Sequence, residues 1–284
     1  MYYLKIIFAA LTVTTAIAHP GPDQPVPHAE IQRRNELAKK CASQAANFNQ
    51  RRISKRALQK RWEGSGHNVT YEITTGAPYY ETIQNDTCVL SPEVTRGPYV
   101  WPRSQTLRQD MSEDQPGVPL WLDVGVLDMA TCEPLPNVLL DFWHCNATGS
   151  YSSFTHLSPN IEFRELLTEK NLTDYAIGVT DLHTDDTTFL RGMWPTDENG
   201  VMEIKTIFPA VSQKIMGLEP YVFHTEIDRI TNAQDAIYQN GTKGGFNPVV
   251  SIVPADGKDI SKGMIGYITM GVDTAAIETF EYDH

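Results

Sequence analysis

The sequence predicts a mainly β protein, organised as a β-sandwich with a short helical segment near its N-terminus. Short runs of alternating or clustered apolar residues recur through the second half of the chain, as strands require. Glycine- and proline-rich turns separate these runs, and little of the remaining sequence has helical spacing. Short strands joined by such turns are typical of two packed sheets.

Residues 1–61 are expected to precede the sandwich. The apolar run within residues 2–18 ends on Ala16-Ile17-Ala18, so residues 1–18 are interpreted as a signal peptide. Residues 19–61 form either a pro-segment or an N-terminal helical region, because apolar residues between Leu37 and Phe48 recur at helical spacing. Three basic pairs favour removal by processing, and the alternative is a basic helix that docks on an acidic body. The pairs are Arg51-Arg52, Lys55-Arg56 and Lys60-Arg61.

Residues 62–284 form the predicted sandwich domain. Residues 92–99, rich in proline and glycine, interrupt any regular element and predict an ordered loop, and residues 131–136 predict a turn. Four segments between and beyond them have the apolar pattern of a strand. These predicted strands are residues 119–126, 138–143, 201–208 and 264–272.

Charge, sequons and cysteines indicate a secreted or lumenal protein. Residues 1–61 carry 11 Lys/Arg and 3 Asp/Glu, a balance of +8, whereas the remainder carries 12 against 32, a balance of −20. An acidic body argues against nucleic acid or an anionic membrane as partner. No apolar run after the signal peptide is long enough to span a membrane.

Two further features fit the same route. Five Asn-x-Thr sequons predict a glycoprotein, and they begin at Asn68, Asn85, Asn146, Asn171 and Asn240. Four cysteines, Cys41, Cys88, Cys132 and Cys145, suffice for two disulfides in any of three connectivities. None has CxxC spacing, which argues against a zinc site.

The central stretch of the chain is VLLDFWHCNATGSY, residues 138–151. It begins as a strand, continues through a turn signal that ends at Gly149, and places Tyr151 just beyond the turn. One interpretation is a core strand followed by a packed tyrosine, with His144 as a buried structural histidine. The other is a strand end that presents Tyr151 to a metal.

A second group of metal-ligating residue types lies between residues 155 and 190. Nothing in their spacing fixes a coordination geometry, so a solvated loop is preferred to a metal cluster. The group is His156, Asp181, His183, Asp185 and Asp186.

Several segments together resemble the intradiol ring-cleavage dioxygenases, in particular their secreted fungal branch. The most specific pieces are DFWHCNATGSYS, from residue 141, and TFLRG, from residue 188. Others are TCVLSPEVTRGPY from residue 87, QPGVPL from residue 115, DMATCEP from residue 128 and TIFP from residue 206. They occur in the family's order and span roughly residues 70–275.

The resemblance implies a β-sandwich with one ferric ion, Fe(III), held by two tyrosines and two histidines. Tyr151 matches the family's first tyrosine. Ser212 stands where the second tyrosine is expected, and Val222 stands where the first histidine is expected, which leaves His224. A shifted alignment pairs His224 with Glu226, two residues further along the same strand face. The iron site is therefore expected to be atypical, with two of four ligands replaced.

Three functions are compatible with this pattern. The first is an oxidoreductase whose rearranged metal site uses Tyr151, His224 and Glu226, with His144 or Tyr221 as further candidates. The second is a metal-independent enzyme that cyclises, dehydrates or isomerises a phenolic or polyketide-like molecule. The third is a binding protein that uses the sandwich as scaffold.

The partner common to all three is a small aromatic or phenolic molecule. Tyr151, His224 and Arg191 are the candidate catalytic residues, and Tyr99, Ser212 and Tyr221 are the candidate substrate-binding residues. Arg191 is alternatively paired with a carboxylate, and Tyr99 is alternatively a packed loop aromatic. The resemblance also implies a possible homodimer formed through the N-terminal helical region.

Overall fold

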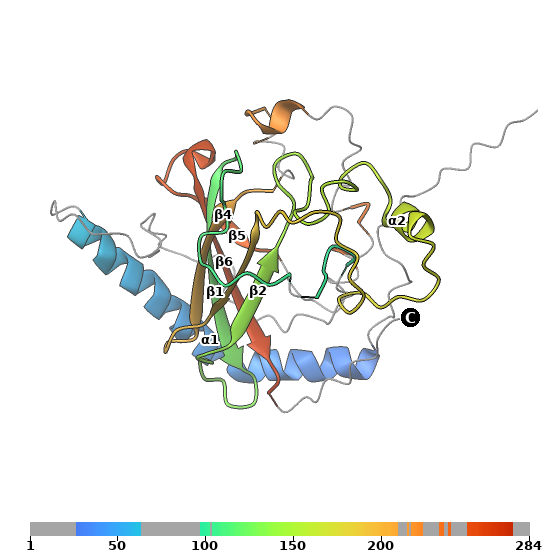
Figure 1. Ribbon diagram of the computed structural model, residues 1–284. Coiled ribbons are helices and arrows are strands. Elements are labelled where there is room, and N and C mark those ends of the chain that lie inside the picture. Colours follow the sequence, from blue (N-terminus) through green and yellow to red (C-terminus); the bar gives the residue numbers. More distant parts are fainter. Residues whose placement is uncertain are drawn as a thin grey trace, which may run out of the picture.

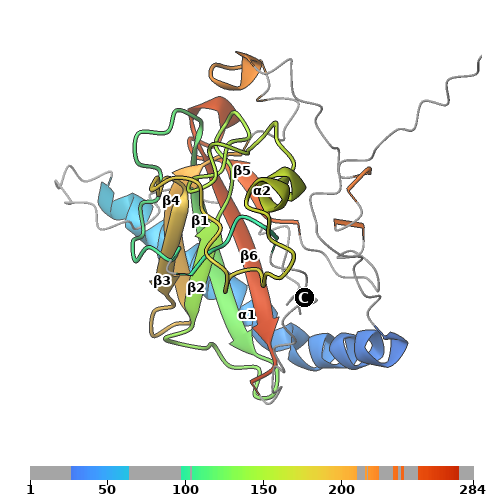
Figure 2. The ribbon, with the colours of Figure 1, turned by 45° about the vertical axis from the view of Figure 1, so that its right-hand side comes forward.

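The protein is a two-sheet structure with one long helix against its outer face (Figures 1 and 2). The computed structural model describes residues 27–63, 97–102, 104–209, 215, 217–223, 233–235, 238–239 and 249–274, with helix side chains to residue 52. Strands β1 (Pro119–Asp128), β4 (Val201–Ile207), β5 (Ser251–Pro254) and β6 (Met264–Val272) form a sheet in the order β4-β1-β6-β5. Strands β2 (Leu139–Trp143) and β3 (Arg191–Pro195) form a second, antiparallel pair.

Strand β1 is the centre of the larger sheet. It pairs antiparallel with β4, where Leu122 faces Ile204, and parallel with β6, where Val124 faces Ile268. Its alternate residues Leu120, Leu122 and Val124 enter the main apolar core. The strand is buried along almost its whole length because its second face is covered as well.

The main core lies between the two sheets. Leu140 and Phe142 of β2 and Trp194 of β3 pack against the buried side chains of the larger sheet. The pair β2–β3 lies in front of the four-stranded sheet in both views, and helix α1 (His28–Glu63) lies behind it. The arrangement is a sandwich with a helix as third layer.

Helix α1 docks on the sheet through one face. The residues on that face are spaced by four, three and four positions along the chain. Cys41, Ala45 and Phe48 are buried on that face, together with Arg52. A disulfide joins Cys41 to Cys132, in the turn after β1. The docked helix, one of the two alternatives for this segment, is therefore present, and its removal by processing stays a prediction.

A long connection from β2 to β3 carries a second layer of structure beside the sandwich. It contains the short helix α2 (Phe163–Glu169) and an apolar cluster of its own, centred on Phe154, Leu157 and Leu182. The single-turn helices η1 (Tyr221–Phe223) and η2 (Ile260–Lys262) complete the described elements.

The predicted fold class is confirmed, and the predicted strands fall within two residues of β1, β2, β4 and β6. The predicted helical region coincides with α1. Strands β3 and β5 and helix α2 were not predicted, because each is too short to show a period of its own. Among the helices that the structure describes, none combines the length and apolarity needed to cross a membrane.

Candidate functional site

The turn after β2 places Tyr151. Asn146 organises this turn, since its Oδ1 accepts hydrogen bonds from the amides of Thr148 and Ser150, each at 3.0 Å. Gly149 adopts φ 85°, a left-handed conformation that glycine tolerates best. Beyond the turn, the amide of Tyr151 donates to Oγ of Ser158 at 2.7 Å. The backbone on both sides of Tyr151 is thus fixed.

Tyr151 stacks on Tyr99. Their ring centroids lie 4.5 Å apart with an interplanar angle of 23°, and the ring of Phe154 lies 5.3 Å from that of Tyr99. Both tyrosines are only partly buried, and both pack against the apolar cluster of the β2–β3 connection. The sequence prediction that these two tyrosines share a site is consistent with this contact, which joins segments about fifty residues apart.

Arg191 holds the two tyrosine segments together. Its Nη2 donates to the carbonyl of Tyr99 at 2.9 Å and to the carbonyl of Ser152 at 2.7 Å, and its Nε donates to Oγ of Ser152 at 3.0 Å. The residue is 2% exposed. Burial lowers the pKa of the guanidinium to about 10, although Asp141 and other neighbours favour its charge. These contacts make Arg191 a positioning residue for the Tyr99–Tyr151 pair.

Two of the six left-handed non-glycine residues in the described part of the chain lie at the same place. Ser153 has φ 65° and Leu190 has φ 57°, so two non-glycine residues beside the Arg191 contacts are left-handed. Such a conformation costs of order 1–3 kcal/mol and is common at functional sites. Leu190 is fully buried, so packing holds its backbone in this conformation. The left-handed backbone at Ser153 and Leu190 supports a functional role for the Tyr99–Tyr151 pair.

The hydroxyl of Tyr151 is held in its neutral form. Burial raises the pKa of this phenol, and the neighbouring thiol of Cys145, which hydrogen-bonds it, raises the pKa further. The nearby charge of Arg191 acts in the opposite direction but is the weaker influence. Burial also raises the pKa of Tyr99. At neutral pH the site therefore presents two intact phenols.

His144 is a structural histidine. Its Nδ1 lies 2.7 Å from the carbonyl of Cys145 and its Nε2 lies 2.7 Å from Oγ1 of Thr206. Because a carbonyl only accepts, Nδ1 carries the proton and Nε2 accepts from the threonine hydroxyl. Burial lowers the pKa of the imidazole, which keeps the ring neutral. With both nitrogens engaged, His144 is not free to bind a metal.

Tyr221 lies in a different environment from Tyr151. It is 1% exposed and belongs to the main core between the sheets. Its hydroxyl accepts from the amide of Val118 and donates to the carbonyl of Phe208, each at 2.8 Å. These contacts favour a structural role over the predicted substrate contact. Three other predicted site residues, Ser212, His224 and Glu226, lie outside the described residues.

The described residues contain only part of the expected ferric site. Of Tyr151, His224 and Glu226, only Tyr151 lies in the part of the chain that the structure describes. Within that part no three His, Cys, Asp or Glu side chains are grouped so that they could hold a metal ion. No step is therefore derived through iron.

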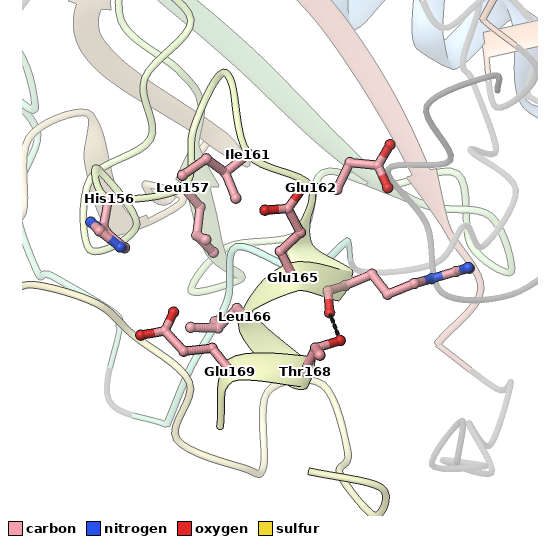
Figure 3. Close-up of a pocket in the computed structure, with 9 residues that line it drawn as sticks. His156, Leu157, Ile161, Glu162, Glu165, Leu166, Thr168 and Glu169 are labelled. Carbon is pink, nitrogen blue, oxygen red and sulfur yellow. Dashed lines mark hydrogen bonds between the residues drawn. The ribbon is translucent and has the colours of Figure 1, made fainter. Parts of the chain in front are cut away.

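An open hollow of about 460 Å³ lies beside α2 (Figure 3). Leu157 and Leu166 line it and belong to the same apolar cluster against which Tyr99 and Tyr151 pack. Glu162, Glu165 and Glu169 line it as well, and these carboxylates disfavour an anionic ligand. His156, predicted as part of a metal group, also lines this hollow.

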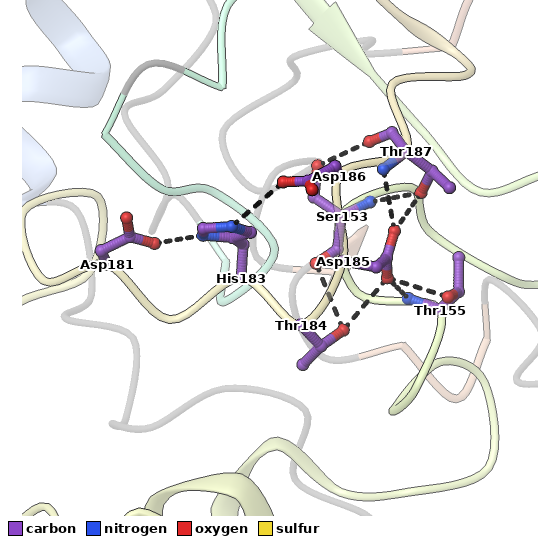
Figure 4. A network of polar contacts seen from close by, with 8 residues as sticks. All are labelled: Ser153, Thr155, Asp181, His183, Thr184, Asp185, Asp186 and Thr187. Carbon is purple, nitrogen blue, oxygen red and sulfur yellow. Dashed lines mark hydrogen bonds and ion pairs between the residues drawn. The ribbon is translucent and has the colours of Figure 1, made fainter.

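The remaining members of that predicted metal group fasten a loop (Figure 4). Asp185 accepts from the amide and hydroxyl of Thr155, both at 2.8 Å, and from the amide of Thr187 at 3.0 Å. His183 pairs with Asp181 and stacks on Trp101 with ring centroids 4.2 Å apart. The preferred interpretation of these residues as loop structure agrees with these contacts.

Sequence reasoning missed the partners of the tyrosine pair. The even number of cysteines predicts that Cys145 forms a disulfide, yet its thiol hydrogen-bonds the hydroxyl of Tyr151. Ser152 is the last residue of the DFWHCNATGSYS motif, and its hydroxyl and carbonyl both accept hydrogen bonds from Arg191. The proximity of both to Tyr151 in the motif was the only signal available. Cys88, the fourth cysteine, lies outside the described residues.

A family model and solved structures of known proteins are similar to this chain. A family model described as Dioxygenase matches residues 95–184, which contain Tyr99 and Tyr151. An intradiol ring-cleavage dioxygenase from Tetranychus urticae superposes with a TM-score of 0.52 at 23% identity, covering 67% of this chain and 98% of the other. A second dioxygenase structure gives 0.52 at 22% identity, with 67% and 97% covered. No curated protein matches the chain.

A catechol 1,2-dioxygenase from Acinetobacter sp. ADP1 is 19% identical and covers 65% of this chain and 62% of its own. Its TM-score of 0.35 is too low to bear on the fold. The first two structures show that the chain has the fold of the intradiol ring-cleavage dioxygenases, as the resemblance implies. The fungal branch and the atypical iron site stay predictions.

Proposed function

Because this chain has the fold of the intradiol ring-cleavage dioxygenases, we propose that it is an enzyme acting on a small phenolic or catechol-like compound beside Tyr151. The observation that carries the proposal is the Tyr99–Tyr151 pair. Two stacked rings are fixed by a buried arginine, and each ring is partly exposed. An aromatic ligand can pack against such a surface while its hydroxyl groups meet the polar end of Tyr151.

Tyr151 supplies the polar contact and a hydrogen-bond donor. In its neutral form the phenol donates a hydrogen bond to an oxygen of the ligand, which favours the deprotonated ligand over the free phenol. Cys145 accepts or donates at the same hydroxyl and so links it to a second titratable group. Arg191 keeps the Tyr151 segment in place and adds positive charge nearby. These roles suit acid–base chemistry at a phenolic oxygen.

A second candidate is an oxidoreductase with a rearranged metal site. The observation that favours it is the spacing of His224 and Glu226, two residues apart, which places both side chains on one face if the segment is extended. Tyr151 would complete that set. The metal would polarise a ligand oxygen, and the residues of the chain would orient the ring beside it.

Turnover measured with and without a strong iron chelator distinguishes the candidates. Catechol, hydroquinone and a polycyclic phenol are offered to the purified protein, and products are followed by mass spectrometry. The first candidate predicts turnover that survives the chelator and falls about 100-fold in Tyr151→Phe, within the range for loss of a positioned acid or base. Loss of turnover with the chelator and recovery with Fe(III) selects the second candidate. Saturable binding with no turnover on any compound contradicts both and leaves a binding protein.

We also propose that the protein belongs to the secretory route, and in particular to the secreted fungal branch of the family. The predicted signal peptide at residues 1–18 and the five sequons motivate this, and the Cys41–Cys132 disulfide is compatible with it. Mass and N-terminal sequence of material collected from a culture medium test it. Light scattering on the same sample tests the predicted homodimer.

A further inference from the structure

The sheet face behind β1 is shaped to receive α1. Gly125 lies in the middle of β1, and a Cβ added there would meet the ring of Phe48 and lie 2.7 Å from Nη1 of Arg52. Such a distance is shorter than real side-chain contacts allow. The strand and the helix therefore fit each other only because residue 125 is glycine.

Arg52 is a buried, charged anchor of α1. It forms an ion pair with Asp123, and the two side chains are 5% and 2% exposed. Its Nη2 also donates to the carbonyl of Asp123 at 2.8 Å, and its Nη1 donates to Oγ1 of Thr269 at 2.9 Å. Removing one partner of such a pair leaves an uncompensated buried charge, which is strongly destabilising. Loss of α1 would impose that penalty on Asp123.

Cys41 lies on the N-terminal side of the three basic pairs named above, whereas Arg33-Arg34 and Lys39-Lys40 precede it. Cys41 precedes Arg51-Arg52, Lys55-Arg56 and Lys60-Arg61, and its partner Cys132 belongs to the sandwich. A cut at any of the three pairs therefore leaves the preceding part of α1 covalently attached. In the chain-entropy description, a crosslink over 91 residues also stabilises the folded state of the uncut chain.

The three basic pairs are not equivalent as processing sites. Arg52 is buried in its ion pair, so Arg51-Arg52 cannot enter a protease cleft while α1 is docked. Lys60-Arg61 lies in the last turn of α1, which ends at Glu63. Carbonyls in the last turn lack helical partners, and helix ends open most easily. Lys55-Arg56 lies between these extremes in the helix.

We propose that, among the basic pairs beyond Cys41, processing is confined to Lys60-Arg61 and Lys55-Arg56, and that it yields a two-chain protein with α1 still in place. Residues up to the cut remain as a helical chain, joined to the sandwich by Cys41–Cys132. In this arrangement the basic segment is a permanent third layer rather than a discarded pro-segment. The proposal does not depend on the substrate or on a metal.

Limited digestion of the full chain tests the proposal. The purified protein is incubated with a serine endoprotease specific for paired basic residues, and fragments are identified by intact mass under denaturing conditions, with and without reductant. The expected first cut follows Arg61, a slower cut follows Arg56, and the two chains separate only after reduction. Cleavage after Arg52 as fast as after Arg61, resistance of all three pairs, or release of the fragment without reductant each overturns the proposal.

Two variants relate the pattern to the docking. Gly125→Val forces Phe48 and Arg52 away from β1, and we expect cleavage after Arg52 to rise about tenfold, which corresponds to an opening cost lowered by about 1.4 kcal/mol. Gly217→Ala is the matched control, because no heavy atom of the described residues beyond its chain neighbours lies within 4 Å of a Cβ added there. If Gly125→Val does not fold, Cys132→Ser serves instead. In this variant the order of the cuts should stay the same, and the N-terminal chain should separate without reductant. If the N-terminal chain still separates only after reduction, the proposal is contradicted.

Discussion

The face of the sheet that receives α1 and the loop region around Tyr151 are built in opposite ways. At the α1 face, a regular helix packs against a regular strand. Helical residues Cys41, Ala45 and Phe48 lie against a strand whose small residue, Gly125, leaves room for them. Around Tyr151, side chains from three separate segments meet on irregular backbone, and Ser153 and Leu190 are strained.

This difference separates stability from function. The α1 face is buried and crosslinked, and its contacts gain nothing from a ligand. The region around Tyr151 keeps two phenols partly exposed and uses a buried charge, Arg191, to hold them. Rigid placement of exposed aromatic groups contributes to binding rather than to folding. Variants in the two regions should therefore affect different measurements.

The largest effect is expected for Arg191→Met. The change leaves the carbonyls of Tyr99 and Ser152 without their donor, so the free energy of unfolding should fall by about 3 kcal/mol. The near-ultraviolet circular dichroism of the stacked tyrosines should fall with it. Arg191→Lys retains the charge but not the planar guanidinium, so its free energy of unfolding should lie between those of the parent and Arg191→Met. A loss below about 1 kcal/mol with an unchanged spectrum would show that Arg191 positions nothing.

Gly125→Ala probes the α1 face. The added methyl group overlaps Phe48 and Arg52, so urea unfolding should show a loss of about 1–3 kcal/mol. Affinity for a phenolic ligand should not change, because the residue lies on the opposite face of the sheet from the main core. Gly217→Ala should stay within about 0.5 kcal/mol of the parent. Equal unfolding curves for the two variants would refute the close fit.

Tyr221→Phe and Tyr151→Phe form a matched pair. Removing the hydroxyl of Tyr221 leaves the amide of Val118 and the carbonyl of Phe208 unpaired, and the expected loss in stability is about 1–2 kcal/mol. Ligand affinity should be unaffected. Tyr151→Phe should show the reverse, with nearly unchanged stability and weaker binding. Reduced ligand affinity in Tyr221→Phe would instead restore it as a substrate contact.

The smallest effect is a pH dependence from His144. Burial lowers its pKa in the folded state below the value near 6.5 of an unfolded chain, so the unfolded state binds more protons as the pH falls. The stability contribution is therefore complete above about pH 6.5 and is lost below it. The melting temperature between pH 7.5 and 5 should fall more in the parent than in His144→Gln. His156→Gln, a change at an exposed histidine, should behave like the parent.

The fold could be predicted from the sequence because its long strands and α1 have clear periods. The turn after β2 was also predictable, since Asn146 and Gly149 have local conformational preferences that need no tertiary contact. The docking of Arg52 on Asp123 was not predictable, because a basic residue in a basic segment gives no sign of burial.

The candidate site was predictable only as a set of residue types. The motif resemblance selected Tyr99, Tyr151 and Arg191, but the stack and the hydrogen bonds that join them depend on loop backbone far apart in sequence. Tyr221 is among the predicted substrate-binding residues, whereas its hydroxyl is bound within the main core by the amide of Val118 and the carbonyl of Phe208. The spacing of residues along the chain predicts neither the contacts between distant loops nor the burial of a particular tyrosine.

Equilibrium binding of catechol is the most direct test of the account. Calorimetry with the parent protein should show saturable binding, and Tyr151→Phe should bind at least about tenfold more weakly, as loss of one hydrogen bond to a bound phenol implies. Tyr221→Phe should match the parent. Equal affinity in the parent and Tyr151→Phe, or no saturable binding at all, would contradict the claim that the Tyr99–Tyr151 pair is the site.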